Sequence, residues 1–305
     1  MATGRKAKPG KKAATKAKKP AATRKRTTKA AAASTPTATA SSAYEFIIVR
    51  RVGAACEIQL NRPDKLNAIN QEIAGDITEA LVEAEMDRSV TAIVLGGNEK
   101  SFCAGADLGG MSTKPEERFD VYRSRFNVMK NRQMYRTLCY YTKPVIAAVE
   151  GFCLGGGFEM AMWGDMIIAG EAASFALPET RHSLFPGGGG TQNLPRLIGP
   201  AIAKELIWTA RRITAAEAKE YRILNHLVPK GQALAKAHEL VAAMAKNGPL
   251  GIMMSKQAIN RGLDQSRFNG FLTEGDLAHM LVFSEDRPEG LKAFAEKREP
   301  KFKGQ

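Results

Sequence analysis

The chain lacks several features that define other classes of protein. No stretch approaches the roughly 20 apolar residues of a membrane-spanning helix, so no membrane span is expected. No apolar run near the N-terminus matches a secretory signal, and a cytoplasmic location is the default expectation. The 4 cysteines show neither C-x-x-C spacing nor histidines at zinc-ligand spacing. We therefore expect reduced, mostly buried thiols and no metal site.

Residues 1–44 contain no acidic side chain and no Leu, Ile, Val, Phe or Trp. They carry twelve Lys and Arg, so the rest of the chain has only +2 of the formal net charge of +14. A segment without large apolar residues cannot offset the entropy cost of ordering. We predict a disordered basic Lys/Ala/Pro tail over residues 1–44. A mitochondrial transit peptide stays open, although the Lys-Pro pattern argues against an amphipathic Arg-rich helix.

The basic tail also suggests a second function of a different class. It resembles the lysine-alanine-proline tails of linker histones, and its cations can neutralise phosphates of a nucleic acid or another polyanion. No aromatic residue precedes Tyr44, which argues against base stacking. Such contact is therefore expected to be nonspecific and to accompany a function located elsewhere in the chain.

From Tyr44 onward, apolar patterns predict strands and helices. Residues 45–51 and 54–60 have the pattern of a hairpin with one face in the core. Asn70 is expected to cap a helix with one buried apolar stripe. Continuous apolar runs then predict further strands at 91–95, 144–149, 166–169 and 174–177, with a short helix at 158–163 and a polar helical region at about 115–138.

Apolar strands that alternate with helices indicate an α/β protein whose parallel strands are buried on both faces. Beyond Gly199 the patterns become helical, and Thr214 with Glu217 forms a capping box. We expect a core over residues 45–240 and a helical oligomerisation region over residues 241–305. The helices expected after Gly199 span 202–209, 214–221, 232–245, 249–261 and a last segment through Phe294.

Two glutamates lie beside glycine runs in the middle of the chain. Glu159 follows the glycines at 155–157, and Glu179 precedes those at 187–190. Paired carboxylates can hold one water and divide proton donation and acceptance between them. Glycine lets backbone N–H groups approach a substrate oxygen. This combination suits chemistry on a carbonyl group.

Five motifs between residues 61 and 192 strengthen that interpretation. In order and spacing they resemble the enoyl-CoA hydratase/isomerase (crotonase) family, and the resemblance covers residues 45–305. Each motif alone is weak because glycine runs are common, but five in order are specific. They are Asn61-Arg62-Pro63-x-x-Leu66-Asn67-Ala68, Phe102-Cys103-Ala104-Gly105-Ala106-Asp107-Leu108, Lys143-Pro144-Val145-Ile146-Ala147-Ala148-Val149-x-Gly151, Leu154-Gly155-Gly156-Gly157 and Pro186-Gly187-x-Gly189-Gly190-Thr191-Gln192.

The resemblance implies a crotonase-like (ClpP/crotonase) spiral of ββα repeats followed by a helical trimerisation region. Family members act on acyl thioesters of coenzyme A, which is part of the substrate, and they form trimers or dimers of trimers. No nicotinamide, flavin or metal cofactor is expected, and the sequence has neither a dinucleotide fingerprint nor a Walker A motif. β-Oxidation of fatty acids is the commonest setting for such an enzyme, and aromatic-acid degradation is the next.

The resemblance also implies roles for individual residues. The backbone N–H groups of Ala106 and Gly156 match an oxyanion hole for the thioester oxygen. A water between Glu159 and Glu179 would add to a 2-enoyl thioester, with Glu159 deprotonating the water and Glu179 protonating C2. The alternative is an isomerase that moves a double bond from position 3 to position 2. Many such relatives use only the carboxylate that corresponds to Glu179.

Other positions match the family's substrate contacts or depart from its pattern. Glu150 stands where an amide is more usual, which predicts an extra negative charge under the glycine loop, and Ser183 stands where glycine is common. His182 is expected to be structural or exposed rather than catalytic. Phe294 and Lys297 match a C-terminal segment that reaches a neighbouring subunit's ligand. The substrate-binding and CoA-binding candidates are Lys65, Leu66, Ala68, Ala104, Asp107, Leu108, Gly155, Pro178, Gly187, Phe294 and Lys297.

Overall fold

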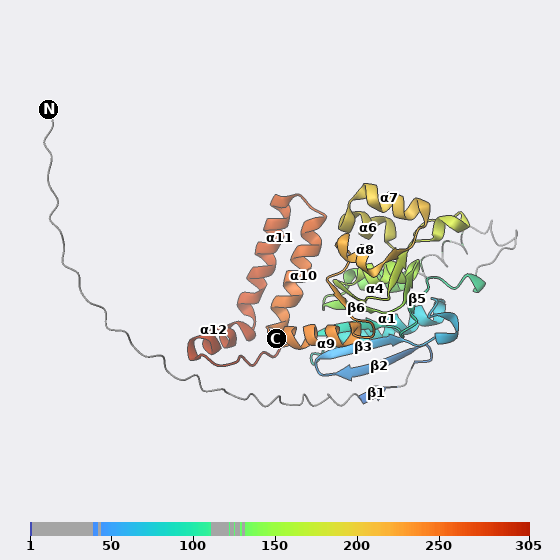
Figure 1. Ribbon diagram of the computed structural model, residues 1–305. Helices are drawn as coiled ribbons and strands as arrows, with labels where there is room; N and C mark the ends of the chain where they lie inside the picture. The colour runs from blue at the N-terminus through green and yellow to red at the C-terminus, as the bar shows by residue number, and fades with distance from the viewer. Residues whose placement is uncertain (2–38, 42–43, 111–121, 123–124, 126–128, 130–131) are drawn as a thin grey trace, which may run out of the picture. The chain divides into compact units, whose positions relative to one another are not determined.

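The computed structural model describes Met1, residues 39–41, 44–110, 122, 125, 129 and 132–305 (Figure 1). Residues Met1–Thr35 and Pro36–Gln305 form separate units, and the fold belongs to the second unit. Most of the helical region predicted at 115–138 lies outside the described residues. None of the helices in the described ranges is long and apolar enough to cross a bilayer.

The larger of two sheets has seven strands in the order β1-β2-β3-β4-β6-β8-β11. The first three strands pair antiparallel, as the predicted hairpin requires, and the next four pairings are parallel. The strand β1 lies inside the segment predicted to be disordered, so that prediction fails at residues 39–41. The bounds are β1 Thr39–Ser41, β2 Ile47–Val52, β3 Ala55–Leu60, β4 Ala92–Gly96, β6 Val145–Val149, β8 Met166–Gly170 and β11 His226–Val228.

The smaller sheet has four strands in the order β10-β9-β7-β5. β5, β7 and β9 are parallel to one another, and β10 closes the edge antiparallel to β9. The apolar pattern of the sequence missed β5, β7 and β10 because strands of two or three residues are too short for an alternation to show. The bounds are β5 Ser101–Cys103, β7 Phe152–Leu154, β9 Ser174–Ala176 and β10 Ile213–Thr214.

From β4 to β9, successive strands of the chain enter the larger and the smaller sheet in turn. β4, β6 and β8 enter the larger sheet, and each is followed directly by a strand of the smaller sheet, β5, β7 and β9. The returns from β5 to β6 and from β7 to β8 run through α4 (Gln133–Tyr140) and α5 (Gly156–Trp163), and the return from β9 to β11 is longer and includes β10 of the smaller sheet. This succession is the spiral of ββα turns that the resemblance implies, and the α/β fold class is confirmed.

Local sequence explains where several helices begin. The Asn70 side chain accepts the backbone N–H of Ile73 at 3.0 Å and caps α1. Thr214 and Glu217 form the predicted capping box of α8. The remaining predicted helices are present, except that the last predicted segment divides into α11 and α12; α6 is an addition after the second glycine run. Their bounds are α1 Gln71–Met86, α6 Gly190–Ile198, α7 Pro200–Thr209, α8 Ala215–Glu220, α9 Ala233–Met244, α10 Pro249–Leu263, α11 Arg267–Met280 and α12 Asp286–Glu296.

Helix α9 corrects two expectations. It packs against the face of the larger sheet opposite the main core, and Val241 joins the small apolar cluster between them. The boundary predicted at 240–241 therefore falls inside a helix that belongs to the core. β3 is also buried on both faces rather than one, because α9 covers the second face. Glu57 of β3 is paired there with Arg50 at 3.1 Å and with His238 of α9 at 2.9 Å.

Candidate active site

The first glycine run forms a sharp turn between β7 and α5. Gly155 has φ +50° and ψ −127°, a conformation that only glycine adopts readily. Gly156 is consequently the first residue of α5, where a backbone N–H has no partner within the helix. This N–H lies at the positive end of the helix dipole, which favours a developing negative charge.

The N–H of Ala106 lies close to Gly156. Ala106 forms a parallel bridge with Ile69, in which the carbonyl of Gly105 and the N–H of Asp107 make the hydrogen bonds at 2.7 and 2.8 Å. The N–H of Ala106 itself therefore points away from Ile69. A β-carbon built on Gly156 would lie 3.7 Å from this nitrogen. The structure brings together the two predicted oxyanion donors, and neither donates to another described residue.

Glu159 is held by the second glycine run. It lies in the first turn of α5, is only 3% exposed, and its Oε1 accepts the N–H groups of Gly188 at 2.7 Å and Gly190 at 2.8 Å. Burial raises the pKa of Glu159, while the two N–H groups act in the opposite direction. Both donors bind Oε1, which leaves Oε2 for a water or substrate.

Gly188, Gly189 and Gly190 of the second glycine run leave no room for side chains, whereas Gly187 is exposed. A β-carbon on Gly188 would lie 2.7 Å from Oε2 of Glu159, and Gly189 has φ +120°. The indole Nε1 of Trp163 donates to the carbonyl of Gly188 at 2.6 Å. These contacts explain why this loop needs consecutive glycines.

Glu179 begins a short 3-10 helix, Glu179–His182, after β9. Its Oε2 is buried without a hydrogen-bond partner among the described residues. Burial, together with the charge of Glu159, raises the pKa of Glu179 to about 7. The following Ser183 has φ +56°, a left-handed conformation in which glycine is favoured. His182 is exposed.

The predicted nucleotide and pantetheine contacts converge on one loop. Leu66 and Asn67 both have left-handed conformations, and the buried Asn67 amide donates to the carbonyls of Ser101 and Phe102 at 2.9 and 3.1 Å. The N–H of Ala104 binds the carbonyl of Leu66 at 3.0 Å. The loop that carries Lys65, Leu66 and Ala68 therefore lies beside the strand end that carries Ala104, Asp107 and Leu108.

Arg62 joins these two segments, and the sequence interpretation gave it no role. Its guanidinium pairs with Asp107 at 2.8 Å and donates to the carbonyl of Ala68 at 2.9 Å. The ion pair holds the pKa of Asp107 below its usual value. The Asn61-Arg62-Pro63 motif was the signal that could have assigned this linking role.

The other candidates divide into two groups. Pro178 directly precedes Glu179, and Gly187 lies in the loop that leads to Glu159's donors, so both are near the carboxylates in the chain. Phe294 and Lys297 lie at the end of α12, and Phe294 is 87% exposed. Within this chain no hydrogen bond or ion pair between described residues joins either of them to the site.

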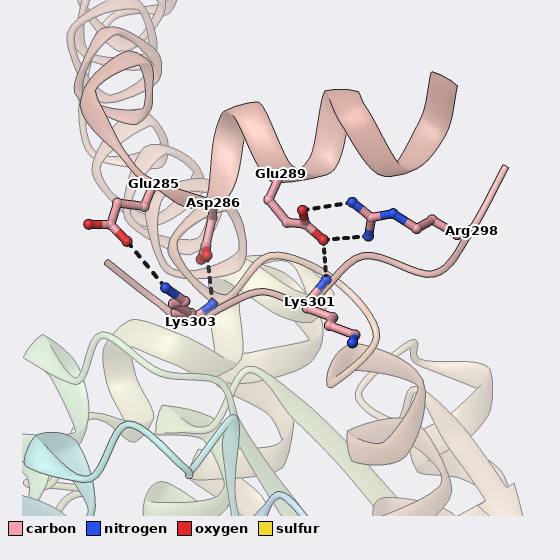
Figure 2. Close-up of a pocket in the computed structure, with 6 residues that line it drawn as sticks. All are labelled: Glu285, Asp286, Glu289, Arg298, Lys301 and Lys303. Carbon is pink, nitrogen blue, oxygen red and sulfur yellow. Dashed lines mark hydrogen bonds and ion pairs between the residues drawn. The ribbon is translucent and has the colours of Figure 1, made fainter. Parts of the chain in front are cut away.

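The segment after α12 closes a charged cavity of about 410 Å³ (Figure 2). Glu289 binds the guanidinium of Arg298 through two contacts of 2.7 and 2.9 Å. Asp286 accepts the N–H groups of Lys303 and Gly304 at 2.6 and 2.8 Å. These contacts fasten the C-terminal residues to α12, and the cavity contains none of the candidate site residues.

Glu150 does not lie under the glycine loop, contrary to expectation. Its Oε1 accepts the N–H of Ala233 at 3.1 Å, at the start of α9, and its carboxylate packs against Gly170. A negative charge at a helix N-terminus is favourable. The side chain therefore serves α9 on the opposite side of the larger sheet.

Residues 50–305 match the family model described as enoyl-CoA hydratase/isomerase. The chain belongs to the enoyl-CoA hydratase/isomerase (crotonase) family. A short-chain-enoyl-CoA hydratase of Clostridium acetobutylicum is 38% identical over 83% of this chain and 95% of its own. A 2,3-dehydroadipyl-CoA hydratase of Escherichia coli is 35% identical over 85% of this chain and 98% of its own.

Solved structures of the crotonase family also share the fold. The crystal structure of an enoyl-CoA hydratase from Bacillus anthracis superposes with a TM-score of 0.80 at 37% identity. The match covers 86% of this chain and 100% of that one. The alternating strands of the two sheets therefore belong to a crotonase fold.

Proposed function

We propose that this chain is an enoyl-CoA hydratase, a hydro-lyase that adds water syn across the 2,3-double bond of a 2-enoyl-CoA. The product is a 3-hydroxyacyl-CoA. The observation that carries the proposal is the pair of carboxylates with raised pKa, buried Glu159 and partly buried Glu179, beside the N–H groups of Ala106 and Gly156, which donate to no other described residue. An isomerase needs one carboxylate, and the two glycine donors to Glu159 hold a second in place.

In the proposed reaction the N–H groups of Ala106 and Gly156 bind the thioester oxygen. Oε2 of Glu159 accepts a proton from the water whose oxygen forms the bond to C3. The electron pair of the double bond moves onto the thioester oxygen as an enolate, which the two N–H groups stabilise. C2 then takes the proton of Glu179, whose pKa of about 7 keeps part of the carboxyl protonated near neutral pH.

The test is hydration of a panel of short, medium and aromatic 2-enoyl-CoA thioesters, followed as loss of the conjugated thioester absorbance. Glu159→Gln and Glu179→Gln are each expected to lower kcat about 10²- to 10⁴-fold. Glu171→Gln is the matched control because Glu171 is exposed. No decay with any thioester would overturn the hydratase proposal.

The same variants distinguish the isomerase alternative. The wild type should also isomerise a 3-enoyl-CoA, because Glu179 can move a proton without an added water. We expect this reaction to be slower than hydration. Loss of hydration with retained isomerisation in Glu159→Gln would assign the water to Glu159. Faster isomerisation than hydration in the wild type would make the isomerase the principal activity.

We also propose that coenzyme A binds along the loop that carries Lys65, Leu66 and Ala68, with its pantetheine arm beside Ala104, Asp107 and Leu108. The Arg62–Asp107 ion pair supports this by fastening the two segments together. The chemistry uses no cofactor beyond the coenzyme A of the substrate. Lys65→Gln is expected to raise KM for the acyl-CoA and to leave kcat unchanged, because the nucleotide is remote from the double bond.

The helices after α9 support a homotrimer or a dimer of trimers. They expose large apolar side chains to a degree that usually marks an interface. In such an assembly, Phe294 and Lys297 would contact a neighbouring subunit's ligand. The mass in solution, measured by light scattering, should be three or six times that of the chain. The exposed residues are Ile259, Leu263, Phe268, Phe271, Leu272, Met280, Val282, Phe283, Leu291 and Phe294.

The twelve cations of residues 1–44 support nonspecific contact with nucleic acid or another polyanion as an addition to catalysis. A gel shift at low and moderate salt should compare the wild type with a variant in which all twelve are glutamine. That variant keeps the chain length and β1 unchanged. Equal shifts for the two proteins would remove the tail from consideration.

A further inference from the structure

We propose that Tyr135 is a positioning residue that couples two loops of the site. One is the turn at Gly155 and Gly156, here called the oxyanion turn, and the other is the loop of the second glycine run, which holds Glu159. Tyr135 lies on α4, outside every motif of the family resemblance. The proposal rests on the hydratase function above, but its central test is binding of an enolate and does not require turnover.

The hydroxyl of Tyr135 contacts the oxyanion turn directly. It donates a hydrogen bond to the carbonyl of Gly156 at 3.0 Å. A β-carbon on Gly156 would lie only 2.6 Å from this hydroxyl oxygen. The absence of a side chain at Gly156 therefore leaves room for the tyrosine as well as for the substrate. The hydrogen bond fixes the position of Gly156, whose N–H would bind the thioester oxygen.

The ring of the same side chain contacts the second loop. A β-carbon on Gly188 would lie 2.7 Å from Cζ and 2.8 Å from Cε2 of Tyr135. The same position is 2.7 Å from Oε2 of Glu159. Since the N–H of Gly188 binds the other oxygen of Glu159, the ring packs on the residue that orients the carboxylate.

The surroundings of Tyr135 keep it neutral. Burial and the nearby carboxylates of Glu159 and Glu179 raise its pKa well above the usual value. The phenol consequently stays a hydrogen-bond donor through the working pH range. A proton-transfer role is disfavoured, and the remaining role is to hold the two loops, which the one side chain contacts through its hydroxyl and its ring.

Tyr135→Phe removes the hydroxyl and keeps the ring. We expect kcat to fall about three- to tenfold, as for loss of one hydrogen bond, with KM unchanged. The decisive experiment uses a 3-oxoacyl-CoA as a probe, because its enolate carries negative charge on the thioester oxygen. Binding of the enolate is measured by its ultraviolet absorbance. The enolate band should weaken in Tyr135→Phe, while the acidic limb of the pH profile should stay in place because the ring still packs on Gly188.

Tyr135→Leu removes the ring as well. Water would then reach Glu159, the burial that raises its pKa would decrease, and the acidic limb of kcat/KM should move to lower pH. Tyr141→Phe is the matched control for the hydroxyl, because the Tyr141 hydroxyl also donates to a backbone carbonyl, that of Leu81, at 2.9 Å. It should leave the enolate band and kcat unchanged.

Two outcomes would overturn the proposal. One is a Tyr135→Phe variant with the same kcat and enolate band as Tyr141→Phe. The other is a folded Tyr135→Leu variant whose acidic limb does not move. A wild type that binds the enolate but hydrates no thioester would instead refute the hydratase function, and the enolate band would still test Tyr135. A wild type that does neither would overturn both.

Discussion

Glu159 and Trp163 lie one turn apart on α5 and bind the two backbone polar groups of the same residue, Gly188. Oε1 of Glu159 accepts the N–H at 2.7 Å, and Nε1 of Trp163 donates to the carbonyl at 2.6 Å. Residues four apart share a helix face, so one face of α5 both presents the carboxylate and fixes the loop that orients it. The orientation of Glu159 is therefore set by its own helix through Gly188.

Trp163→Phe should weaken this arrangement because it deletes the indole donor and keeps an aromatic ring. We expect kcat to fall about three- to tenfold, in line with one buried hydrogen bond. Trp208→Phe is the control, since the other tryptophan of the chain is 71% exposed on α7. Initial rates of the two variants with one enoyl-CoA decide the matter, and equal rates would contradict the role of Trp163.

Gly188→Ala should damage both stability and activity. The added methyl group would meet Oε2 of Glu159 and the ring of Tyr135 below van der Waals distance. Overpacking of this kind typically costs about 1–3 kcal/mol in the free energy of unfolding. The comparison is Gly75→Ala in α1, where nothing lies within 4 Å; it should stabilise the helix by about 0.5–1 kcal/mol. Denaturant unfolding measures both, and a harmless Gly188→Ala would disprove the close packing.

The pH dependence of hydration should report Glu179. If Glu179 donates the proton to C2, only its protonated form is active, and its pKa is about 7. The rate constant kcat/KM should then fall as pH rises through about 7, because this profile reports groups of the free enzyme. Rates measured at saturating and at low enoyl-CoA between pH 5 and 9 separate kcat from kcat/KM. A flat alkaline limb up to pH 9 would be incompatible with Glu179 as the acid.

The same carboxyl should make the protein less stable at alkaline pH. Its pKa is raised from 4.5 to about 7 by folding, so its contribution is fully present below pH 4.5 and is lost as pH rises through 7. Glu179→Gln cannot ionise and avoids this loss. At pH 8 it should be more stable than the wild type by about 1–3 kcal/mol, reduced because solvent partly reaches the side chain.

Thermal unfolding at pH 5 and pH 8 measures this effect. The gain in stability of Glu179→Gln over the wild type should be larger at pH 8 than at pH 5. Glu171→Gln provides the control for removal of an exposed carboxylate. A gain of the same size at both pH values would show that ionisation of Glu179 does not oppose folding.

Local sequence was sufficient for features that depend on neighbours in the chain. The Asn70 cap, the Thr214 capping box and the buried runs that became β4 and β6 were all predicted. The boundary at 240–241 failed for a different reason. An amphipathic helix shows that it has a buried face but not which surface covers it, so α9 could not be assigned to the sheet from its pattern alone.

The sequence by itself determined the family and the positions of Ala106, Gly156, Glu159 and Glu179, because glycine turns and carboxylates are recognisable from residue type and order. Tertiary structure decided what surrounds them. Burial raises the pKa values of both glutamates, and the charge of Glu159 raises that of Glu179 further; both effects depend on distances between segments remote in the chain. The contacts of Tyr135 also depend on tertiary structure, because a tyrosine on α4 touches both glycine loops only after the spiral brings α4 and α5 together.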